Sequence, residues 1–195
     1  VLAQPTQPRS GSTRGMRPLE GVPHFNRSGV TLYNGCALTL LPRLRGVADL
    51  VVTDPPYKLT SGGRNAQVMS GIFASDRYDN SGELMATLGW AEFAKPLLEA
   101  CRPNADAYIM ANDKQVFSAH AAMTGAGWRC HNLLVWNKGF PTRNRWYMKE
   151  NEYTLYLWKG RARTIRNPGS KQTFMTPLPS PAEKIHSTQK PLALL

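Results

Sequence analysis

The chain has 195 residues, of which 24 are Lys or Arg and 13 are Asp or Glu, so its formal net charge is +11. This length suits one domain with its own hydrophobic core, and a hydrophobic content of 42% argues against general disorder. No stretch approaches 18 consecutive apolar residues, which excludes a membrane-spanning helix. The excess of positive charge favours a polyanionic partner, most often nucleic acid.

The three cysteines, Cys36, Cys101 and Cys130, are widely spaced and odd in number. They form no C-x-x-C pair, so the sequence predicts neither a disulfide framework nor a metal site of the usual zinc spacing. We expect a reducing, intracellular compartment. Residues 1–28 are rich in Pro, Gly, Ser and Arg, and no apolar segment of a secretion signal is present, so we interpret them as a flexible basic arm.

The first ordered element is expected to be a short strand at 30–33, followed by a short helix over 36–44 that Pro42 disturbs. Residues 48–53 are mostly apolar and partly β-branched, which predicts a strand covered on both faces of an α/β sheet. Residues 57–82 show no hydrophobic period and contain Gly-Gly and Asp-Asn-Ser-Gly, so we expect a long loop there.

Residues 83–101 follow a helical period, in which Pro96 should cause a kink or a break. Three more strands are expected, at 107–111, 128–136 and 153–158. A second helix over 114–123 separates the first two of them, and residues 102–104 should form a turn. The alternation of strands and helices, ending in two successive strands, predicts an α/β doubly wound sheet.

Positive charge is concentrated toward the C-terminus. From Lys138 onward, 11 basic residues are opposed by only three acidic ones, so this stretch carries +8 of the net charge. Aromatic residues are interleaved with these cations. The stretch is therefore either a solvated basic surface or a groove in which cations neutralise phosphates and aromatic rings stack on bases.

Asp54-Pro55-Pro56-Tyr57 comes directly after the predicted strand at 48–53. In open α/β sheets, ligands bind at the carboxyl ends of strands. The two prolines remove two backbone donors and stiffen the turn, which leaves carbonyl groups and the Asp54 carboxylate as acceptors beside the flat ring of Tyr57. These groups suit a planar ligand that carries an exocyclic NH2. The alternative is an ordinary proline turn with a packed Tyr.

Residues 50–57, with the sequence LVVTDPPY, strongly resemble motif IV of the amino-group DNA methyltransferases, which modify adenine N6 or cytosine N4. Further segments resemble later parts of this family in the same order, namely AYIMAN at 107–112, LLVWNK at 133–138, EYTLYLWKG at 152–160 and HSTQKP at 186–191. The last resembles motif X, with Ser187 in place of a proline. Motif X after motif IV indicates the circularly permuted, β-type order, and the similarity is greatest to phage and prophage enzymes.

The resemblance implies a Rossmann-like methyltransferase domain over residues 29–195 that uses S-adenosylmethionine as its cofactor. It would methylate the exocyclic amino group of a base flipped out of double-stranded DNA. By this analogy Tyr57 stacks on the base, while Asp54 and the carbonyl of Pro55 accept the amino hydrogens within a catalytic turn completed by Pro56. Asp rather than Ser at the first position favours adenine N6 over cytosine N4. Cytosine C5 methylation is disfavoured, because it requires a nucleophilic cysteine, which in that family follows a proline.

The resemblance also implies which residues contact the cofactor, and the distribution of positive charge predicts which residues contact the DNA. Those expected beside S-adenosylmethionine are Asp54, His186, Thr188, Gln189, Lys190 and Pro191. Residues 188–190 would open a helix whose free amides and ammonium group suit the cofactor's carboxylate. DNA contacts are expected from a basic region at about 138–185 and from the preceding loop, through Lys58, Arg64, Lys138, Arg143, Arg145, Trp146, Lys149, Arg161, Arg163, Arg166 and Lys171.

The sequence departs from the family after motif X. Relatives continue into a strand and a glycine-rich loop, F-x-G-x-G, that holds the cofactor, whereas this sequence runs from Val1 to Leu195. We therefore expect the domain to be incomplete at its C-terminus, as a fragment of a longer frame or as a split or decayed protein. A split protein would need a complementary chain that carries the loop. Two functions stay open: a DNA amino-methyltransferase in the cytoplasm of a bacterial or phage-infected cell, and a non-catalytic DNA-binding fragment or split subunit.

Overall fold

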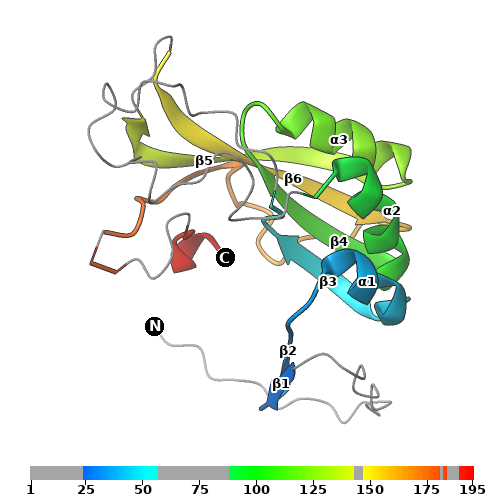
Figure 1. Ribbon diagram of the computed structural model, residues 1–195. Coiled ribbons are helices and arrows are strands. Elements are labelled where there is room, and N and C mark those ends of the chain that lie inside the picture. Colours follow the sequence, from blue (N-terminus) through cyan, green and yellow to red (C-terminus); the bar gives the residue numbers. More distant parts are fainter. Residues whose placement is uncertain (1–23, 57–87, 143–146, 181, 184–188) are drawn as a thin grey trace. The chain divides into compact units, whose positions relative to one another are not determined.

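The computed structural model describes residues 24–56, 88–142, 147–180, 182–183 and 189–195 (Figure 1). It divides the chain into two units, Val1–Cys36 and Ala37–Leu195. In the first unit, strands β1 (His24–Arg27) and β2 (Val30–Tyr33) form an antiparallel hairpin. Ser28 and Gly29 both have positive φ, 52° and 78°, as a tight hairpin turn requires. The last part of the arm expected at 1–28 is therefore a strand, and residues 1–23 lie outside the described residues.

The second unit contains a five-stranded mixed sheet in the order β3-β4-β6-β5-β7. Its strands are β3 (Ala48–Thr53), β4 (Cys101–Ala111), β5 (Arg129–Thr142), β6 (Lys149–Lys159) and β7 (Thr173–Met175). The pairs β3–β4 and β5–β7 are parallel, whereas β6 runs antiparallel to both of its neighbours. Four strands therefore end at one edge of the sheet, where β6 begins. We call this edge the carboxyl edge and the opposite one the amino edge.

Helices cover one face of this sheet. Helix α1 (Ala37–Leu40) continues into a 3-10 helix, η1 (Leu41–Leu44). A separate short 3-10 helix, η3 (Leu192–Leu194), lies near the C-terminus. Helices α2 (Trp90–Ala100) and α3 (Val116–Gly125) lie on the same face (Figure 1). Their buried side chains pack against alternate residues of β4 and β6, which together form the core. The α/β class predicted from the sequence is confirmed.

Two local predictions need correction. Pro96 lies inside α2 without ending it, because Phe93 and Leu97 on either side anchor the helix in the core and packing outweighs the missing backbone hydrogen bond. The turn predicted at 102–104 is an irregular part of β4. Ala48 pairs with Cys101 but Leu50 pairs with Asp106, so the intervening residues of β4 bulge out of the register.

Strand β3 lies at one end of the sheet and is covered on one face only. Val51 packs against the core, whereas Leu50 and Val52, which point to the other face, are 56% and 47% exposed. The prediction of a strand covered on both faces is therefore wrong for the described residues. The reason is that α2 and α3 lie on the same face, and apolar composition cannot reveal this choice. No helix in the described ranges is long and apolar enough to cross a membrane.

Because β6 is the central strand of the sheet, a substitution that creates a cavity there should strongly lower the stability of the fold. Leu157 is fully buried among the core residues, so Leu157→Ala should lower the free energy of unfolding by about 2–5 kcal/mol. Phe117→Ala is the control, because Phe117 is 79% exposed on α3 and its loss should change stability by less than about 0.5 kcal/mol. Urea unfolding followed by tryptophan fluorescence measures both. Equal losses in the two variants would contradict the observed placement of β6.

Candidate active site

Asp54, Pro55 and Pro56 follow β3 at the carboxyl edge. Pro55 is buried and Pro56 is exposed, and the Asp54 side chain keeps 31% of its exposure. The carbonyl of Pro56 accepts a hydrogen bond from the backbone N–H of Leu88 at 2.8 Å, which ties the turn to the start of α2. The turn therefore presents a partly open carboxylate at the tip of a strand. Tyr57, the predicted stacking residue, lies outside the described residues.

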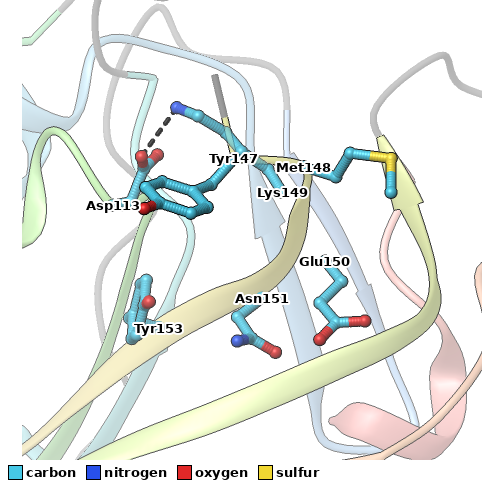
Figure 2. A pocket seen from close by; sticks show the side chains of 7 residues that line it. All are labelled: Asp113, Tyr147, Met148, Lys149, Glu150, Asn151 and Tyr153. Carbon is cyan, nitrogen blue, oxygen red and sulfur yellow. Dashed lines mark ion pairs between the residues drawn. The ribbon is translucent and has the colours of Figure 1, made fainter. Parts of the chain in front are cut away.

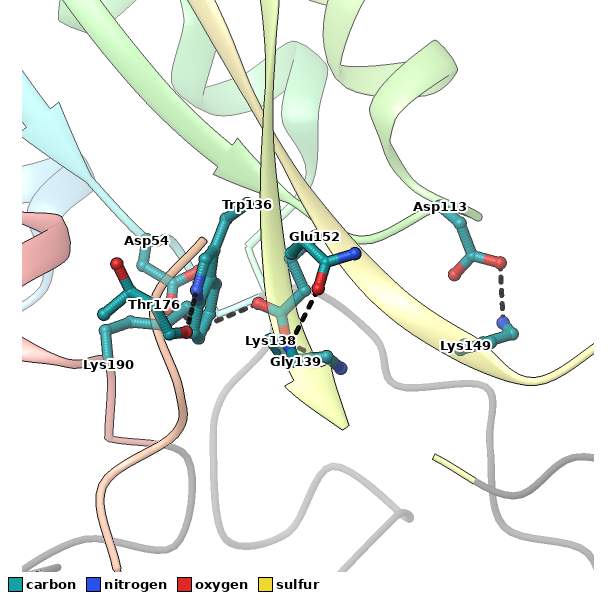
Figure 3. A network of polar contacts seen from close by, with 10 residues as sticks. Asp54, Asp113, Trp136, Lys138, Gly139, Lys149, Glu152, Thr176 and Lys190 are labelled. Carbon is teal, nitrogen blue, oxygen red and sulfur yellow. Dashed lines mark hydrogen bonds and ion pairs between the residues drawn. The ribbon is translucent and has the colours of Figure 1, made fainter. Parts of the chain in front are cut away.

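Lys190 connects the C-terminal segment to this turn. Its Nζ lies 2.7 Å from Oδ2 of Asp54 and 3.2 Å from Oε2 of Glu152 on β6 (Figure 3). The other oxygen of Glu152, Oε1, lies 3.6 Å from Nζ of Lys138 on β5. The two lysine side chains are only 14% and 10% exposed. Asp54, Lys190, Glu152 and Lys138 thus form a row of alternating charges, which we call the charge row.

The charge row keeps Lys190 protonated. Desolvation alone would lower the pKa of its ammonium group, but the charges of Glu152 and Asp54, with the hydrogen bonds they accept, raise the pKa above its ordinary value. The formal charges of the row sum to zero. An ammonium group that already has two carboxylate partners is less available to a third, and the contact of Lys190 with the carboxylate of a cofactor stays a prediction.

Strand alternation places Asp54 and Glu152 on the same face of the sheet. Val51 and Leu155 face the helices, so residues separated from them by an odd number of positions face the other way. Trp136 pairs with Glu152 across β5 and β6. Its buried indole N–H donates to the carbonyl of Thr176 at 2.7 Å (Figure 3). The segment after β7 is therefore fixed beside the charge row.

A pocket of about 320 Å³ opens at the same edge (Figure 2). It is lined by Asp113, Tyr147, Met148, Lys149, Glu150, Asn151 and Tyr153. Nζ of Lys149 lies 2.6 Å from Oδ2 of Asp113, which follows β4. The pocket is lined by two aromatic rings together with charged and amide groups, and the Tyr147 ring is 93% exposed.

Two predicted DNA contacts lie at the amino edge instead of beside Asp54. The backbone N–H of Arg161 donates to the side chain of Asn104 at 3.0 Å. The guanidinium group of Arg163 contacts the Asn104 carbonyl and lies 3.6 Å from Asp49 and 3.9 Å from Asp106. Both arginines follow β6, which ends toward the start of β4, so they lie nearer the amino edge than the turn at 54–56 does.

The other described members of the predicted DNA set divide into three cases. Lys138 is buried and paired within the charge row, so the prediction that it contacts DNA is not retained. Lys149 lies at the carboxyl edge. Lys171 is exposed and precedes Gln172, whose carbonyl accepts a hydrogen bond from the backbone N–H of Val135. Val135 and Ala111, the last residue of β4, both pair with Tyr153, so Lys171 lies near the carboxyl edge as well. Arg166 is exposed.

Several predicted site residues cannot be placed. His186, Thr188, Lys58, Arg64, Arg143, Arg145 and Trp146 lie outside the described residues. Gln189 and Pro191 flank Lys190, and Pro191 is buried, but the backbone at 189–191 is not helical. The helix expected to open at 188–190 is replaced in the described segment by η3, which begins at Leu192. The cause is Pro191, because a residue before proline disfavours helical backbone.

Sequence reasoning missed Glu152, which it counted only as an acid that opposes the basic residues. The available signal was the pair of carboxylates, Glu150 and Glu152, in the strand segment ENEYTLYLW, of which Glu152 pairs across the sheet with a tryptophan of the neighbouring strand. An acidic side chain that is shielded from solvent in such a strand needs a cationic partner. Lys190 and Lys138 are those partners.

The described cysteines of the sheet do not support thiolate chemistry at this site. Cys101 begins β4, and Cys130 lies near the start of β5, so both lie toward the amino edge. Burial raises the pKa of the Cys101 thiol and also that of the Cys130 thiol. Both thiols are therefore poorly ionised and far along the strands from Asp54.

Comparison with known proteins gives a consistent set of similarities. A profile of the DNA methylase family N6_N4_Mtase matches residues 48–195. The chain is 25% identical over 149 residues to the Type II methyltransferase M2.DpnII of Streptococcus pneumoniae, covering 70% of this chain and 53% of that protein. It therefore spans about half the length of this curated relative. The crystal structure of the M1.HpyAVI–SAM complex is also similar, with 19% identity, a TM-score of 0.48 and coverage of 75% of this chain and 61% of that chain. A second crystal structure of M1.HpyAVI has 15% identity, a TM-score of 0.46 and coverage of 71% of this chain and 60% of that chain.

The charge row predicts a pH-dependent contribution to stability. Lys190→Met leaves two carboxylates without their shared cation and should lower the free energy of unfolding by about 2 kcal/mol, less than for a fully buried pair because Asp54 is partly exposed. The pKa of Lys190 is raised on folding. The difference should therefore be constant below pH ~10, near the unfolded pKa, and should shrink as the pH rises through the folded value.

Urea unfolding of both proteins between pH 7 and 11 measures this difference. Arg45→Met is the matched control, because it removes the cation of the exposed Arg45–Glu99 pair and should cost less than about 1 kcal/mol. A loss for Lys190→Met that is no larger than the control, or that grows toward pH 11, would contradict the charge row.

Proposed function

The chain belongs to the family of N6/N4 DNA methylases, and on this basis we propose that it provides the base-binding part of a DNA methyltransferase. The enzyme would transfer a methyl group from S-adenosylmethionine to the exocyclic amino group of a base in double-stranded DNA, with adenine N6 as the preferred acceptor. One observation carries the proposal: a proline-stiffened turn at the end of β3 presents the Asp54 carboxylate, with Lys190 bound to one of its oxygens.

The proposed role of this turn is to accept and orient the amino group. Oδ2 of Asp54 is occupied by Lys190, so Oδ1 is the oxygen that accepts an amino N–H. The carbonyl of Pro55 accepts the second hydrogen, and Tyr57 stacks on the ring. A base within a duplex cannot reach such a turn, so it must be flipped out.

The described residues fit this reaction through the carboxylate of Asp54, which suits both an amino group and a nearby sulfonium. When bound, the cofactor supplies a methyl group on positively charged sulfur. Asp54 aims the nitrogen lone pair along the line of transfer. Orientation of this kind can supply roughly 7–11 kcal/mol of a barrier. No nucleophilic side chain is required, which agrees with the raised pKa values of Cys101 and Cys130.

Methylation of DNA tests the proposal directly. The protein from its complete reading frame is incubated with DNA and S-adenosylmethionine, and the digested nucleosides are identified by mass spectrometry. We expect N6-methyladenine. We expect Asp54→Asn to lower the methylation rate at least about 100-fold, as for other groups that bind developing charge, with unchanged DNA affinity.

Asp49→Asn is the control, because Asp49 lies at the other end of β3 and pairs with Arg102 at 2.7 Å. It should methylate at the wild-type rate. N4-methylcytosine as the product would keep the proposal but replace the preferred base. DNA binding without methylation would favour the alternative, a non-catalytic DNA-binding part of such an enzyme, and 5-methylcytosine would contradict both.

Substitutions of cations at the two edges of the sheet should change the salt dependence of DNA binding by different amounts. Lys171→Ala removes an exposed cation level with the carboxyl edge, so the slope of log K against log salt should decrease by about 1. Arg163→Ala removes a cation already paired with the protein's own carboxylates at the amino edge, so it should leave the slope unchanged. Fluorescence anisotropy between 50 and 300 mM salt, on the order of the physiological range, measures both. Equal slopes for the two variants would contradict this assignment.

A further inference from the structure

We propose that Glu152 is a positioning residue for Asp54 and acts through the ammonium group of Lys190. Glu152 holds Nζ of Lys190 in the one place where this group also binds Oδ2 of Asp54. This inference rests on the proposed function of Asp54. It adds a residue of β6 to a site that the sequence located only at the end of β3 and near the C-terminus.

The first step of the argument is geometric. A lysine ammonium is a mobile point charge on a flexible four-carbon chain, so a single ion pair does not fix its position. Nζ of Lys190 has two carboxylate partners, at 2.7 Å on Asp54 in the turn after β3 and at 3.2 Å on Glu152 in β6 (Figure 3). Glu152 is itself anchored by its place within β6, opposite Trp136. The rigid sheet thereby fixes the position of the ammonium.

The second step concerns burial and charge. The side chain of Lys190 is 14% exposed and that of Glu152 is 25% exposed, so solvent screens their ion pair poorly. The charged groups that face Lys190 in the described residues are Asp54 from the end of β3 and Glu152 from β6, with Lys138 from β5 on the far side of Glu152. Without the charge of Glu152, Lys190 would keep only one anion, and desolvation would count more strongly against its protonated form.

The third step links the charge row to the reacting group. The carboxylate of Asp54 can turn about its own side-chain bonds, and only one of its oxygens is bound to Lys190. A fixed ammonium on Oδ2 sets the plane of the carboxylate, so that Oδ1 stays at the open side of the turn. Displacement of the ammonium would let both oxygens rotate, which affects the orientation of the amino group more than the affinity for DNA.

The titration of Lys190 tests the inference without DNA or cofactor. Lysine labelled with 13C and 15N is incorporated into the 195-residue chain, and the Lys190 signal is titrated by NMR in wild type, Glu152→Gln and Glu99→Gln. Glu152→Gln should lower the pKa of Lys190 by about one unit, which corresponds to about tenfold faster acetylation at pH 8. Glu99→Gln, which breaks the exposed pair with Arg45, should change neither. An unchanged Lys190 titration in Glu152→Gln overturns the inference.

Methylation kinetics of the complete protein then separate positioning from a general structural role. Glu152→Gln should lower kcat about tenfold, leave KM for DNA unchanged and move the alkaline limb of the kcat profile to lower pH. Glu152→Asp, which restores the charge, should recover part of the rate. Wild-type kcat in a stable Glu152→Gln protein overturns the positioning role alone. A wild-type protein that methylates no DNA overturns the proposed function as well, whatever the Lys190 titration shows.

Discussion

The ion pair between Lys190 and Asp54 is the contact on which the site depends. It holds a segment near the C-terminus against the tip of β3, and Glu152 binds the same ammonium from β6. Three segments that are far apart in sequence thus meet at one point of the carboxyl edge. Because the Lys190 side chain is only 14% exposed, loss of either carboxylate removes one of its two anionic partners in poorly solvated surroundings. That cost favours a single arrangement of the turn that follows β3.

The sheet also divides the chain's charges into two groups. At the amino edge, Arg102 and Arg163 neutralise Asp49 and Asp106, so these cations are committed within the protein. At the carboxyl edge, the charge row is balanced internally and Lys149 is paired with Asp113, whereas Lys171 is exposed. A net charge of +11 is therefore distributed over surfaces with different roles. Under the proposed function, DNA is attracted to the cations that the protein does not itself neutralise.

Much of the fold could be predicted from local sequence, because short apolar runs and helical periods reflect contacts made within each element. The predicted bounds of β3 agree with the structure, and β4, β5 and β6 are each predicted as strands that are shorter than observed. The role of Glu152 could not be predicted, because it depends on the β5–β6 register and on a lysine 38 positions away in the sequence. The number of positive charges predicts that Lys138 and Arg163 contact DNA. The composition does not show that carboxylates of the folded chain already bind these two side chains.

A crystal structure of the complete protein with DNA that it methylates and an unreactive analogue of S-adenosylmethionine tests the central claim most directly. The account predicts a base rotated out of the duplex, with its exocyclic nitrogen about 2.7–3.2 Å from Oδ1 of Asp54. In the same complex, Lys190 should still bind Oδ2, and the ring of Tyr57 should lie against the base. A target base that stays stacked in the duplex, or an amino group bound by side chains other than Asp54 while Lys190 points elsewhere, would contradict it.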